Sequence, residues 1–423
     1  MNCLKTNSLE YTLKMILSNL SKKFDFAIFG AVPYNHVLRG RTGALVDNLC
    51  QRGFYVNYFE MPPASVLQYF KNPMSYHRGL LDFLFPKPTV SANLIIYSFP
   101  PVFPAARFET GWIKRYNQQR VYRSMQTQYL PLARERNRPV VALVATPWWY
   151  EAIKRINFSL LCYDCIDDIR VFCSERQLKY FLELQRELIE KSDLIFISAK
   201  KLENDIISVR PTASIEFLPN GVDADYFSAK GSNIPIPPKF KNLPRPIIGF
   251  VGTLYYWIDT QILETMARTF TNSSIVLVGP VKNIKIPMLP NIHLLPPIPY
   301  SSVPEYISTF DVCVIPFIAD SLSEKVDPIK VYEYLSLGKP VVAINLAELE
   351  KVRELIYLAK DKFDFINCIR IALEENDPQL RERRMAYARQ NSWAIRVEQL
   401  IGTVENYLNK KKNEFNLQIS QPI

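Results

Sequence analysis

The sequence predicts an α/β protein built from two doubly wound domains with a ligand cleft between them. Short apolar runs of strand length alternate with amphipathic helical stretches, as in a parallel sheet covered by helices. This alternation occurs twice, and a proline-rich stretch at 228–245 separates the two occurrences. A chain of 423 residues also exceeds the usual size of one core. We therefore expect an N-terminal extension (1–23), a first domain (24–227), a linker (228–245), a second domain (246–392) and a final helix (393–423).

The first domain opens with FDFAIFG (24–30), an apolar run that predicts a buried strand. A helix at about 38–52 follows this strand. The same pattern predicts a long helix at 174–191 and further strands at 54–60, 92–100, 139–147, 158–166, 192–199 and 213–221. The aromatic, proline-punctuated segment 62–90 fits neither pattern.

The second domain opens with PIIGFVGT (246–253), an apolar run that predicts its first buried strand. Further strands are predicted at 273–280, 291–297, 311–317 and 340–344. Sharp signals bound a short helix at 328–337. Asp327 is a good N-cap, Pro328 suits the first helical position, and Gly338 can adopt the left-handed conformation that ends a helix. Parallel strands place their carboxyl ends at one edge, where ligands bind in such sheets. The loop 318–326 and the start of this helix should therefore lie at the cleft.

The composition is that of an ordinary globular protein, with 48% hydrophobic and 22% charged residues. No apolar run approaches the roughly 20 residues that span a bilayer, and the first residues lack the apolar core of a secretory signal. Seven cysteines, an odd number, indicate reduced thiols in the cytoplasm. Cys162 and Cys165 form a C-x-x-C pair, but the histidines are distant in sequence, so we expect no metal site.

The net charge of +10 favours an acidic partner such as nucleic acid, anionic lipid or a phosphorylated substrate. Basic and aromatic residues are interleaved in GWIKRYNQQRVYRSMQTQYL (111–130). This mixture suits an anionic membrane surface better than nucleic acid, because Trp112 and Tyr116 can rest at the headgroup level. A solvated helix face with arginine stems lying along it explains the same pattern. We therefore expect no nucleic-acid partner and take the membrane surface as a candidate partner.

Several residues at the predicted cleft edge of the second domain suit a phosphorylated ligand. Gly252 and Gly279 end two strands and allow close backbone approach. Lys330 adds positive charge to the first turn of helix 328–337, an arrangement expected for a diphosphate. Glu333, one turn further on, can accept two hydrogen bonds from a vicinal diol such as a ribose. The alternative is an exposed ion pair between Lys330 and Glu333, which are three residues apart on one helix face.

Four segments carry a family resemblance: SDLIFISAKKL (192–202), LPNGVDADYF (218–227), GFVGTLYYWIDTQIL (249–263) and PIKVYEYLSLGKPVVA (328–343). In this order they resemble the nucleotide-sugar glycosyltransferases of the GT-B fold. The most similar branch is group 1, which includes teichuronic-acid and related exopolysaccharide transferases. The resemblance implies two facing Rossmann-like domains, with the donor in the C-terminal domain and the acceptor in the N-terminal one. It also implies that the final helix crosses back to the first domain and that no metal or other cofactor is required.

The resemblance assigns roles to individual residues of the second domain. Glu333 falls on the glutamate that holds the donor ribose, and Lys330 falls on the position that meets the diphosphate. Gly252 and Thr253 fall on the loop near the donor phosphates. Ile298 falls on the position whose backbone reads the base.

This chain also departs from the family pattern at two places. The family has a second glutamate eight residues before Glu333, where this chain has Lys325. The usual Arg and Lys after the first glycine loop are replaced by LYYWID (254–259). We therefore expect Lys325 to share the diphosphate charge with Lys330.

In the first domain, LLCYDCIDDIRVF (160–172) places Asp164 at the end of a strand, where the family commonly has a histidine facing the sugar. A carboxylate there can act as general base toward an acceptor hydroxyl in an inverting displacement. Asp167 and Asp168 are rival candidates, because neighbouring carboxylates raise one another's pKa. Helix capping and solvent exposure are the structural alternatives for these residues.

The junction between the first strand and the first helix supplies three candidate acceptor contacts. Gly30 ends the strand, and His36 and Arg39 lie in the loop that follows it. Arg39 can hold an acceptor phosphate, and a plain surface role is its alternative.

These features predict a glycosyltransferase that moves a sugar from a nucleoside-diphosphate sugar to a hydroxyl of a glycan or lipid-linked glycan in cell-surface polysaccharide biosynthesis. We expect a cytoplasmic protein attached peripherally to the inner face of the cytoplasmic membrane. One alternative is a nucleotide-sugar epimerase of similar fold. Another is a non-enzymatic basic protein that binds lipid or nucleic acid.

Overall fold

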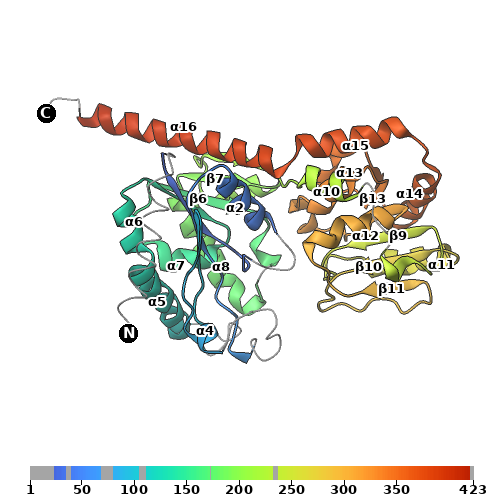
Figure 1. Ribbon diagram of the computed structural model, residues 1–423, viewed down its shortest axis with the longest axis horizontal. Coiled ribbons are helices and arrows are strands. Elements are labelled where there is room, and N and C mark those ends of the chain that lie inside the picture. The colour runs from blue at the N-terminus through green and yellow to red at the C-terminus, as the bar shows by residue number, and fades with distance from the viewer. Residues whose placement is uncertain are drawn as a thin grey trace.

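Each predicted domain contains a sheet of mostly parallel strands in the computed structural model, which describes residues 23–34, 40–67, 80–103, 111–171, 173–231 and 237–419. Figure 1 shows two α/β lobes side by side, with the last helix running along the first lobe. The predicted fold class is therefore confirmed. The predicted N-terminal extension, apart from Lys23, lies outside the described residues.

The first sheet has eight strands in the order β3-β4-β2-β1-β5-β6-β7-β8, and only β3 runs antiparallel to its neighbour. They are β1 (Asp25–Phe29), β2 (Val56–Phe59), β3 (Thr89–Ser91), β4 (Leu94–Tyr97), β5 (Val140–Val144), β6 (Leu160–Cys165), β7 (Leu194–Ile197) and β8 (Ile215–Phe217). The central strand β1 is apolar on both faces because both are covered. Phe26 and Ile28 join one hydrophobic core, and Ala27 and Phe29 join the other.

The described helices of the first domain are α2 (Arg41–Gln51), α4 (Leu80–Leu84), α5 (Gly111–Gln128), α6 (Leu130–Arg136), α7 (Tyr150–Ile153), α8 (Glu175–Lys191) and α9 (Leu202–Val209). Helix α8 begins at the predicted place because Ser174 and Gln177 form a capping box. The short strand β3, which is largely exposed, was not predicted from the sequence.

The second sheet has six parallel strands in the order β11-β10-β9-β12-β13-β14. They are β9 (Ile247–Val251), β10 (Ser274–Val278), β11 (Ile292–Leu295), β12 (Val312–Ile315), β13 (Val341–Ile344) and β14 (Tyr357–Ala359). The helices that follow the first domain are α10 (Ala224–Gly231), α11 (Thr260–Thr269), α12 (Val303–Thr309), α13 (Ile329–Ser336), α14 (Lys362–Glu374), α15 (Pro378–Gln390) and α16 (Trp393–Ile419). Strand β14 was also not predicted.

Helix α16 returns to the first domain, as predicted. Its residues Trp393, Val397, Leu400 and Val404 form an apolar stripe at helical spacing and belong to a first-domain core. This stripe packs the helix against α2. None of the described helices combines the length and the apolar character that crossing a bilayer requires.

The chain passes between the domains at 218–223 and again at 391–393. Val222 and Ser392 form an isolated parallel bridge, so the two crossings lie side by side. A Cβ on Gly221 would lie only 2.8 Å from the carbonyl oxygen of Asn391, which explains a glycine at this close approach. Val222 and Phe227 already pack in the core of the second domain. The first crossing therefore precedes the predicted linker at 228–245.

Asp327 joins the first crossing to the helix α13. Its buried carboxylate accepts hydrogen bonds from the backbone N of Asn220 (2.7 Å), Tyr332 Oη (3.0 Å) and Lys351 Nζ (2.8 Å). The Asn220 side chain in turn donates to the Asp327 carbonyl (2.7 Å). The prediction that Asp327 caps α13 is therefore wrong: Pro328 is the N-cap, and the Asp327 side chain is engaged by these partners. At the other end of α13, Gly338 has a φ of +68°, as predicted.

We expect Asp327→Ala to lower the free energy of unfolding by about 1–3 kcal/mol, because the buried amide of Asn220 and the buried hydroxyl of Tyr332 lose their acceptor. Asp327→Asn keeps one acceptor oxygen and should cost less. The control is Glu350→Ala, whose exposed ion pair with Arg353 should contribute at most about 1 kcal/mol. Denaturant unfolding of the full chain measures all three, and equal losses for Asp327→Ala and Glu350→Ala would contradict the role of Asp327.

Candidate functional site

Residues from two loops and from the helix α13 of the second domain meet at the carboxyl edge of its sheet. Gly252 follows β9 and Gly279 follows β10, and a Cβ on Gly279 would lie 2.0 Å from the Gly252 carbonyl oxygen. A Cβ on Gly252 would lie 3.3 Å from Lys330 Cε, so the lysine stem of α13 lies against this glycine. Gly279 has a φ of +143°, which glycine adopts without strain. The structure thus brings together Gly252, Gly279 and Lys330.

Lys330 and Glu333 form an ion pair of 2.7 Å on one face of α13. This pair is not the exposed pair of the alternative interpretation, because the Glu333 side chain is only 2% exposed and that of Lys330 is 24% exposed. A carboxylate held almost out of solvent beside a half-buried ammonium is unusual for a surface helix. The pair therefore offers a cation and an acceptor at the cleft edge, next to the glycine turns.

Two further predicted donor contacts lie near these turns. Thr253 follows Gly252 directly and is partly exposed. The side chain of Ile298 is buried in the core of the second domain. A role of its backbone in reading a base stays a prediction.

Lys325 does not lie free at the predicted diphosphate site. Its ammonium reaches across to the first domain, where it pairs with Asp168 (3.0 Å) and Asp205 (2.5 Å). Next to it, Glu324 pairs with Lys201, the residue directly before α9. These ion pairs tie the loop before α13 to the first domain, so a diphosphate would have to compete with two carboxylates for Lys325.

The three candidate bases have different surroundings. Asp164 is fully buried, and its carboxylate receives hydrogen bonds from Arg41 Nη2 (2.8 Å) and Nε (3.0 Å). Asp168 receives them from Arg170 Nε (2.8 Å) and Lys325 Nζ (3.0 Å). Both carboxylates are thus neutralised by cations in a structural role.

Burial raises the pKa of Asp168, but the hydrogen bonds from Arg170 and Lys325 outweigh it and lower the pKa to about 2. Burial also raises the pKa of Asp167, here to about 7, and the charges of Asp327, Asp168 and Asp164 add to the rise although Arg41 opposes it. Within the described part of the chain, the Asp167 carboxylate makes no hydrogen bond or ion pair. Asp167 is therefore the one of the three with a carboxylate available to take up a proton near neutral pH.

The predicted acceptor contacts are only partly described. Gly30 packs tightly, since a Cβ there would lie 2.0 Å from Tyr58 Oη, and its carbonyl accepts a hydrogen bond from Trp149 Nε1 (2.9 Å). These contacts give Gly30 a packing role. His36 and Arg39 lie outside the described residues.

The sequence predicted no role for Arg41. Arg41 is 3% exposed and bridges Asp164 to the side-chain oxygen of Asn220 (3.3 Å). A carboxylate at the end of a buried strand needs a cationic or hydrogen-bonding partner. The predicted position of Asp164 was therefore the sequence signal that pointed to a residue such as Arg41.

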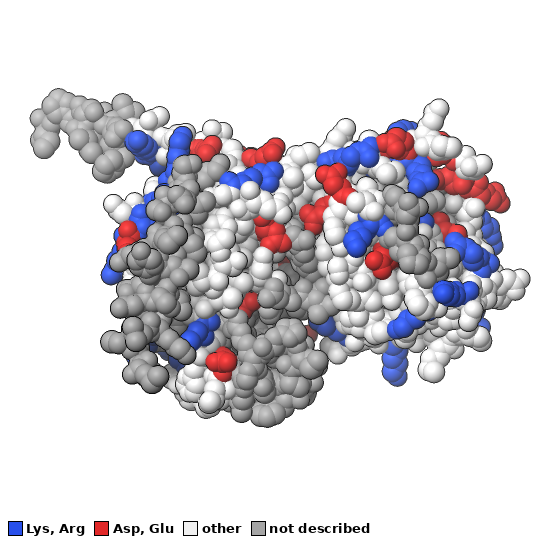
Figure 2. Space-filling model, viewed as in Figure 1, with Lys and Arg blue, Asp and Glu red and all other residues white. Residues whose placement is uncertain are grey.

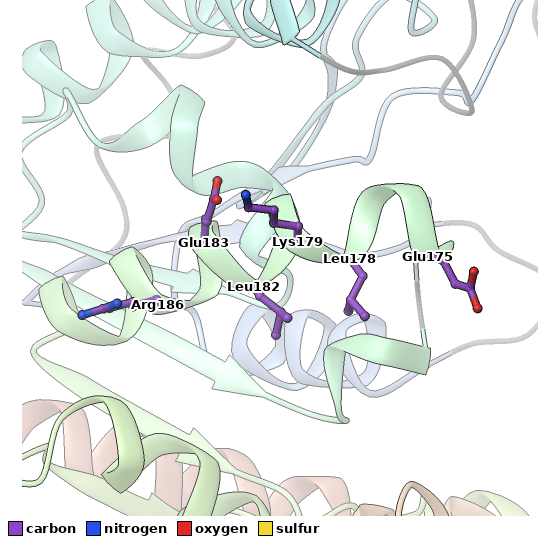
Figure 3. Close-up of a pocket in the computed structure, with 6 residues that line it drawn as sticks. All are labelled: Glu175, Leu178, Lys179, Leu182, Glu183 and Arg186. Atoms are coloured by element: carbon purple, nitrogen blue, oxygen red, sulfur yellow. The ribbon is translucent and has the colours of Figure 1, made fainter.

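Charge and surface shape add two observations. On the face shown in Figure 2, Lys and Arg are spread over both lobes and interleaved with Asp and Glu. A shallow hollow runs along the outer side of α8 (Figure 3), and it is lined by Glu175, Leu178, Lys179, Leu182, Glu183 and Arg186. This hollow shares no residue with the site at the carboxyl edge.

Residues 245–375 match the family model described as Glycosyl transferases group 1. A Bacillus subtilis (strain 168) protein whose assigned name is teichuronic acid biosynthesis glycosyltransferase TuaH is 25% identical over 242 residues, which cover 54% of this chain. The match spans 60% of that protein's length.

Solved structures share the fold over nearly the whole chain. Sucrose-phosphate synthase from Thermosynechococcus elongatus has a TM-score of 0.65 at 13% identity, covering 92% of this chain and 100% of that chain. Trehalose-6-phosphate synthase from Burkholderia multivorans has a TM-score of 0.62 at 11% identity, covering 93% and 100%. An E. coli trehalose-6-phosphate protein bound with UDP-2-fluoro glucose has a TM-score of 0.61 at 11% identity, covering 90% and 98%. The predicted resemblance is thus confirmed: the chain has the fold of GT-B glycosyltransferases, and residues 245–375 are similar to the group 1 glycosyltransferase family.

Proposed function

We propose that the protein is a glycosyltransferase that moves a sugar from a nucleoside-diphosphate sugar to a hydroxyl of a glycan or lipid-linked glycan acceptor in cell-surface polysaccharide biosynthesis. The observation that carries this proposal is the meeting of Gly252, Gly279, Lys330 and Glu333 inside the region that matches the group 1 family. The named relative in teichuronic acid biosynthesis supports the pathway class, and the E. coli structure with UDP-2-fluoro glucose supports the donor class.

In this proposal the second domain holds the donor. The backbone turns at Gly252 and Gly279 approach the diphosphate closely, and Lys330 leaves Glu333 to pair with it. The Glu333 carboxylate, released from Lys330, then accepts hydrogen bonds from the ribose diol. The positive charge of Lys330 and the first turn of α13 compensate the diphosphate, so the proposal includes no metal and no other cofactor.

The first domain supplies the base. Asp167 takes the proton of the acceptor hydroxyl, the hydroxyl oxygen forms the new bond to the anomeric carbon, and the bond from that carbon to the diphosphate oxygen breaks. The nucleoside diphosphate leaves with the electron pair. Attack opposite the leaving group makes this step an inversion. Asp164 and Asp168 remain paired with their cations, and their charges contribute to the raised pKa of Asp167.

A panel of nucleotide-sugars should contain at least one member that raises the melting temperature of the full chain, because a ligand that binds only the folded state stabilises it. Lys330→Met should weaken binding of the diphosphate-containing ligands about tenfold or more, which corresponds to roughly 1.4 kcal/mol. Glu333→Gln should weaken the binding of the corresponding nucleoside as well.

The matched control is Lys241→Met, because Lys241 is exposed and precedes β9 at the opposite edge of the sheet. It should leave all shifts unchanged. The proposed donor site is contradicted if no nucleotide-sugar stabilises the wild-type chain.

The pKa of Asp167 gives a second prediction. The protonated carboxyl stabilises the fold fully below a pH of about 4, and this contribution is lost as the pH rises through about 7, because the folded-state pKa exceeds the ordinary 3.8. Asp167→Asn should therefore increase the free energy of unfolding above neutral pH. It should also lower the transfer rate by about 10²–10⁴-fold and remove the inflection near pH 7.

Release of nucleoside diphosphate across this pH range measures the rate, and denaturant unfolding measures the stability. Asp225→Asn, an exposed change in α10, should leave both the rate and its pH profile intact. A wild-type rate for Asp167→Asn would assign the proton transfer to another group.

The proposal also places the first domain on the cytoplasmic face of an anionic membrane. Six large apolar side chains of this domain are between 49% and 74% exposed, namely Leu67, Leu81, Phe85, Phe103, Trp112 and Tyr116. The rings of Phe103 and Tyr116 are in contact at 6.2 Å. Figure 1 shows α4 and α5, which carry Leu81 and Trp112, at the same end of the lobe. Exposed aromatic residues beside the basic residues of α5 fit the headgroup region of a membrane.

Flotation with vesicles tests this attachment. The wild-type chain should float with phosphatidylglycerol vesicles and less with phosphatidylcholine vesicles, and salt should weaken the binding. The double change Phe85→Ser and Trp112→Ser should reduce flotation several-fold. Met288→Ser, at a residue of the second domain that is 99% exposed, is the control and should have no effect. Equal flotation of all variants, or none for the wild-type chain, would contradict the attachment.

A further inference from the structure

Three consecutive aromatic residues lie in the loop between β9 and α11, where the family resemblance leads one to expect cationic residues. Tyr255, Tyr256 and Trp257 are each partly exposed. Their rings pack edge to face, with centroids 4.9 Å apart for Tyr255 and Tyr256, 5.1 Å for Tyr255 and Trp257, and 5.3 Å for Tyr256 and Trp257. They form one continuous aromatic cluster, which we call the aromatic loop.

Backbone contacts on both sides hold the aromatic loop in place. On one side, Leu254 N donates to the Pro280 carbonyl (2.9 Å), next to the turn at Gly279. On the other side, Ile318 N donates to the Trp257 carbonyl (2.7 Å), and Asp259 N donates to the Pro316 carbonyl (2.8 Å). Asp259 then caps α11 through two further backbone amides. The rings are therefore presented by a fixed loop, which limits the entropy lost when a ligand binds.

The aromatic loop lies on the side of the second domain that meets the first. Trp257 is hydrogen-bonded to Ile318 at the start of the loop 318–326, and Lys325 of that loop pairs with Asp168 of the first domain. Burial is the main cause that raises the pKa of Tyr256 to about 12, and the charges of Asp320, Asp167 and Asp168 contribute to this rise. Within the described part of the chain, the hydroxyls of Tyr255 and Tyr256 and the indole N–H of Trp257 make no hydrogen bond. The loop thus offers polar groups without partners beside exposed ring faces.

The groups around the aromatic loop disfavour an anionic ligand and suit a neutral one. The carboxylate of Asp320, which forms no ion pair within the described part of the chain, disfavours a phosphate next to Tyr256. A neutral sugar ring has the complementary character, because its C–H face packs on an aromatic ring and its hydroxyls bond to phenols and carboxylates. Burial in the core is the alternative for such rings, but their partial exposure and unpaired polar atoms argue against a purely structural role.

We propose that the aromatic loop Tyr255–Trp257 is the subsite that binds the sugar ring of the acceptor beside Asp167. The C–H face of the ring packs on Tyr256 and Trp257, and its hydroxyls bond to the Tyr256 hydroxyl and to Asp320. This places one acceptor hydroxyl within reach of the Asp167 carboxylate. The inference rests on the proposed transferase function, which supplies the need for an acceptor next to the base. It makes the aromatic loop a determinant of acceptor specificity.

Saturation-transfer NMR on the full chain tests the subsite without a known acceptor. The probes are the methyl glycosides of glucose, galactose, mannose and N-acetylglucosamine, with saturation applied to the aromatic protons of the protein. At least one glycoside should receive saturation through its ring protons. Trp257→Ala should reduce this signal at least about fivefold, corresponding to roughly 1 kcal/mol, and Trp257→Phe, which keeps an aromatic face, should retain most of it.

Phe363→Ala is the matched control, because Phe363 is a 68% exposed aromatic residue of α14 outside the site. It should leave the signal unchanged. The nucleotide-sugar stabilisation of Trp257→Ala should equal that of the wild-type chain, which also shows that the variant is folded. If Trp257→Ala does not fold, Tyr256→Phe and Trp257→Phe carry the test, and Tyr256→Phe should weaken the signal through the lost hydroxyl.

The outcomes separate this inference from the function on which it rests. Nucleotide-sugar stabilisation without any glycoside signal, or with a signal that Trp257→Ala leaves intact, overturns the subsite and leaves the donor site standing. A glycoside signal that depends on Trp257 in a chain that no nucleotide-sugar stabilises supports a sugar-binding loop and rejects the transferase.

Discussion

The buried contact between Asp327 and Asn220 is the interaction on which the geometry of the site depends. Asn220 lies in the first crossing between the domains, and Asp327 lies directly before Pro328 and α13. Arg41 Nη1 donates to the Asn220 side chain (3.3 Å) and holds Asp164 at the end of β6. A continuous chain of hydrogen bonds thus runs from the first sheet to the helix that carries Lys330 and Glu333. Because these residues are buried, the loss of one hydrogen bond leaves polar groups without partners. The free-energy cost of that loss holds α13 in a fixed position relative to the first domain.

The same network explains why three neighbouring aspartates behave differently. Asp164 and Asp168 each receive a guanidinium, and Lys325 adds a second cation to Asp168. Asp167 lies between Asp164 and Asp168 in sequence and makes no ion pair within the described part of the chain, so that Arg41 lowers its pKa only through its charge. The cations of the network satisfy its neighbours, so the cost of burying the Asp167 charge is not repaid and its pKa rises. The placement of the cations thus gives Asp167 a pKa near neutral pH, which suits a general base. Changes at Arg41 or Asp327 would alter the pKa of Asp167, although neither residue contacts the proposed acceptor.

Local sequence patterns predicted those features that depend on local physics. Buried strands such as β1 and β13 are continuous apolar runs, and Gly338 ends α13 because few other residues adopt its φ. The errors arose where a distant residue decides the outcome. Asp327 has a good N-cap side chain, but Asn220, which is 107 residues away in sequence, engages it instead. Lys325, which we expected to share the charge of a diphosphate, pairs in the fold with Asp168, 157 residues away in sequence. The three-residue strands β3 and β14 are too short to show a period.

The distribution of charge around the cleft orients the proposed substrates. The chain carries a net charge of +10, yet Lys325 and Lys201 are already paired with carboxylates where the domains meet. We therefore expect the diphosphate of the proposed donor to pair with Lys330 beside the glycine turns, where Glu333 is the only carboxylate among the described residues that forms an ion pair with this ammonium. The aromatic loop follows the turn at Gly252 and is hydrogen-bonded through Trp257 to Ile318, near the carboxylate of Asp320, which repels phosphate and accepts hydroxyl groups. In the proposed function, the sugar of a donor bound at Lys330 then lies on the side of the aromatic loop, because this carboxylate disfavours the phosphates there and favours hydroxyl groups.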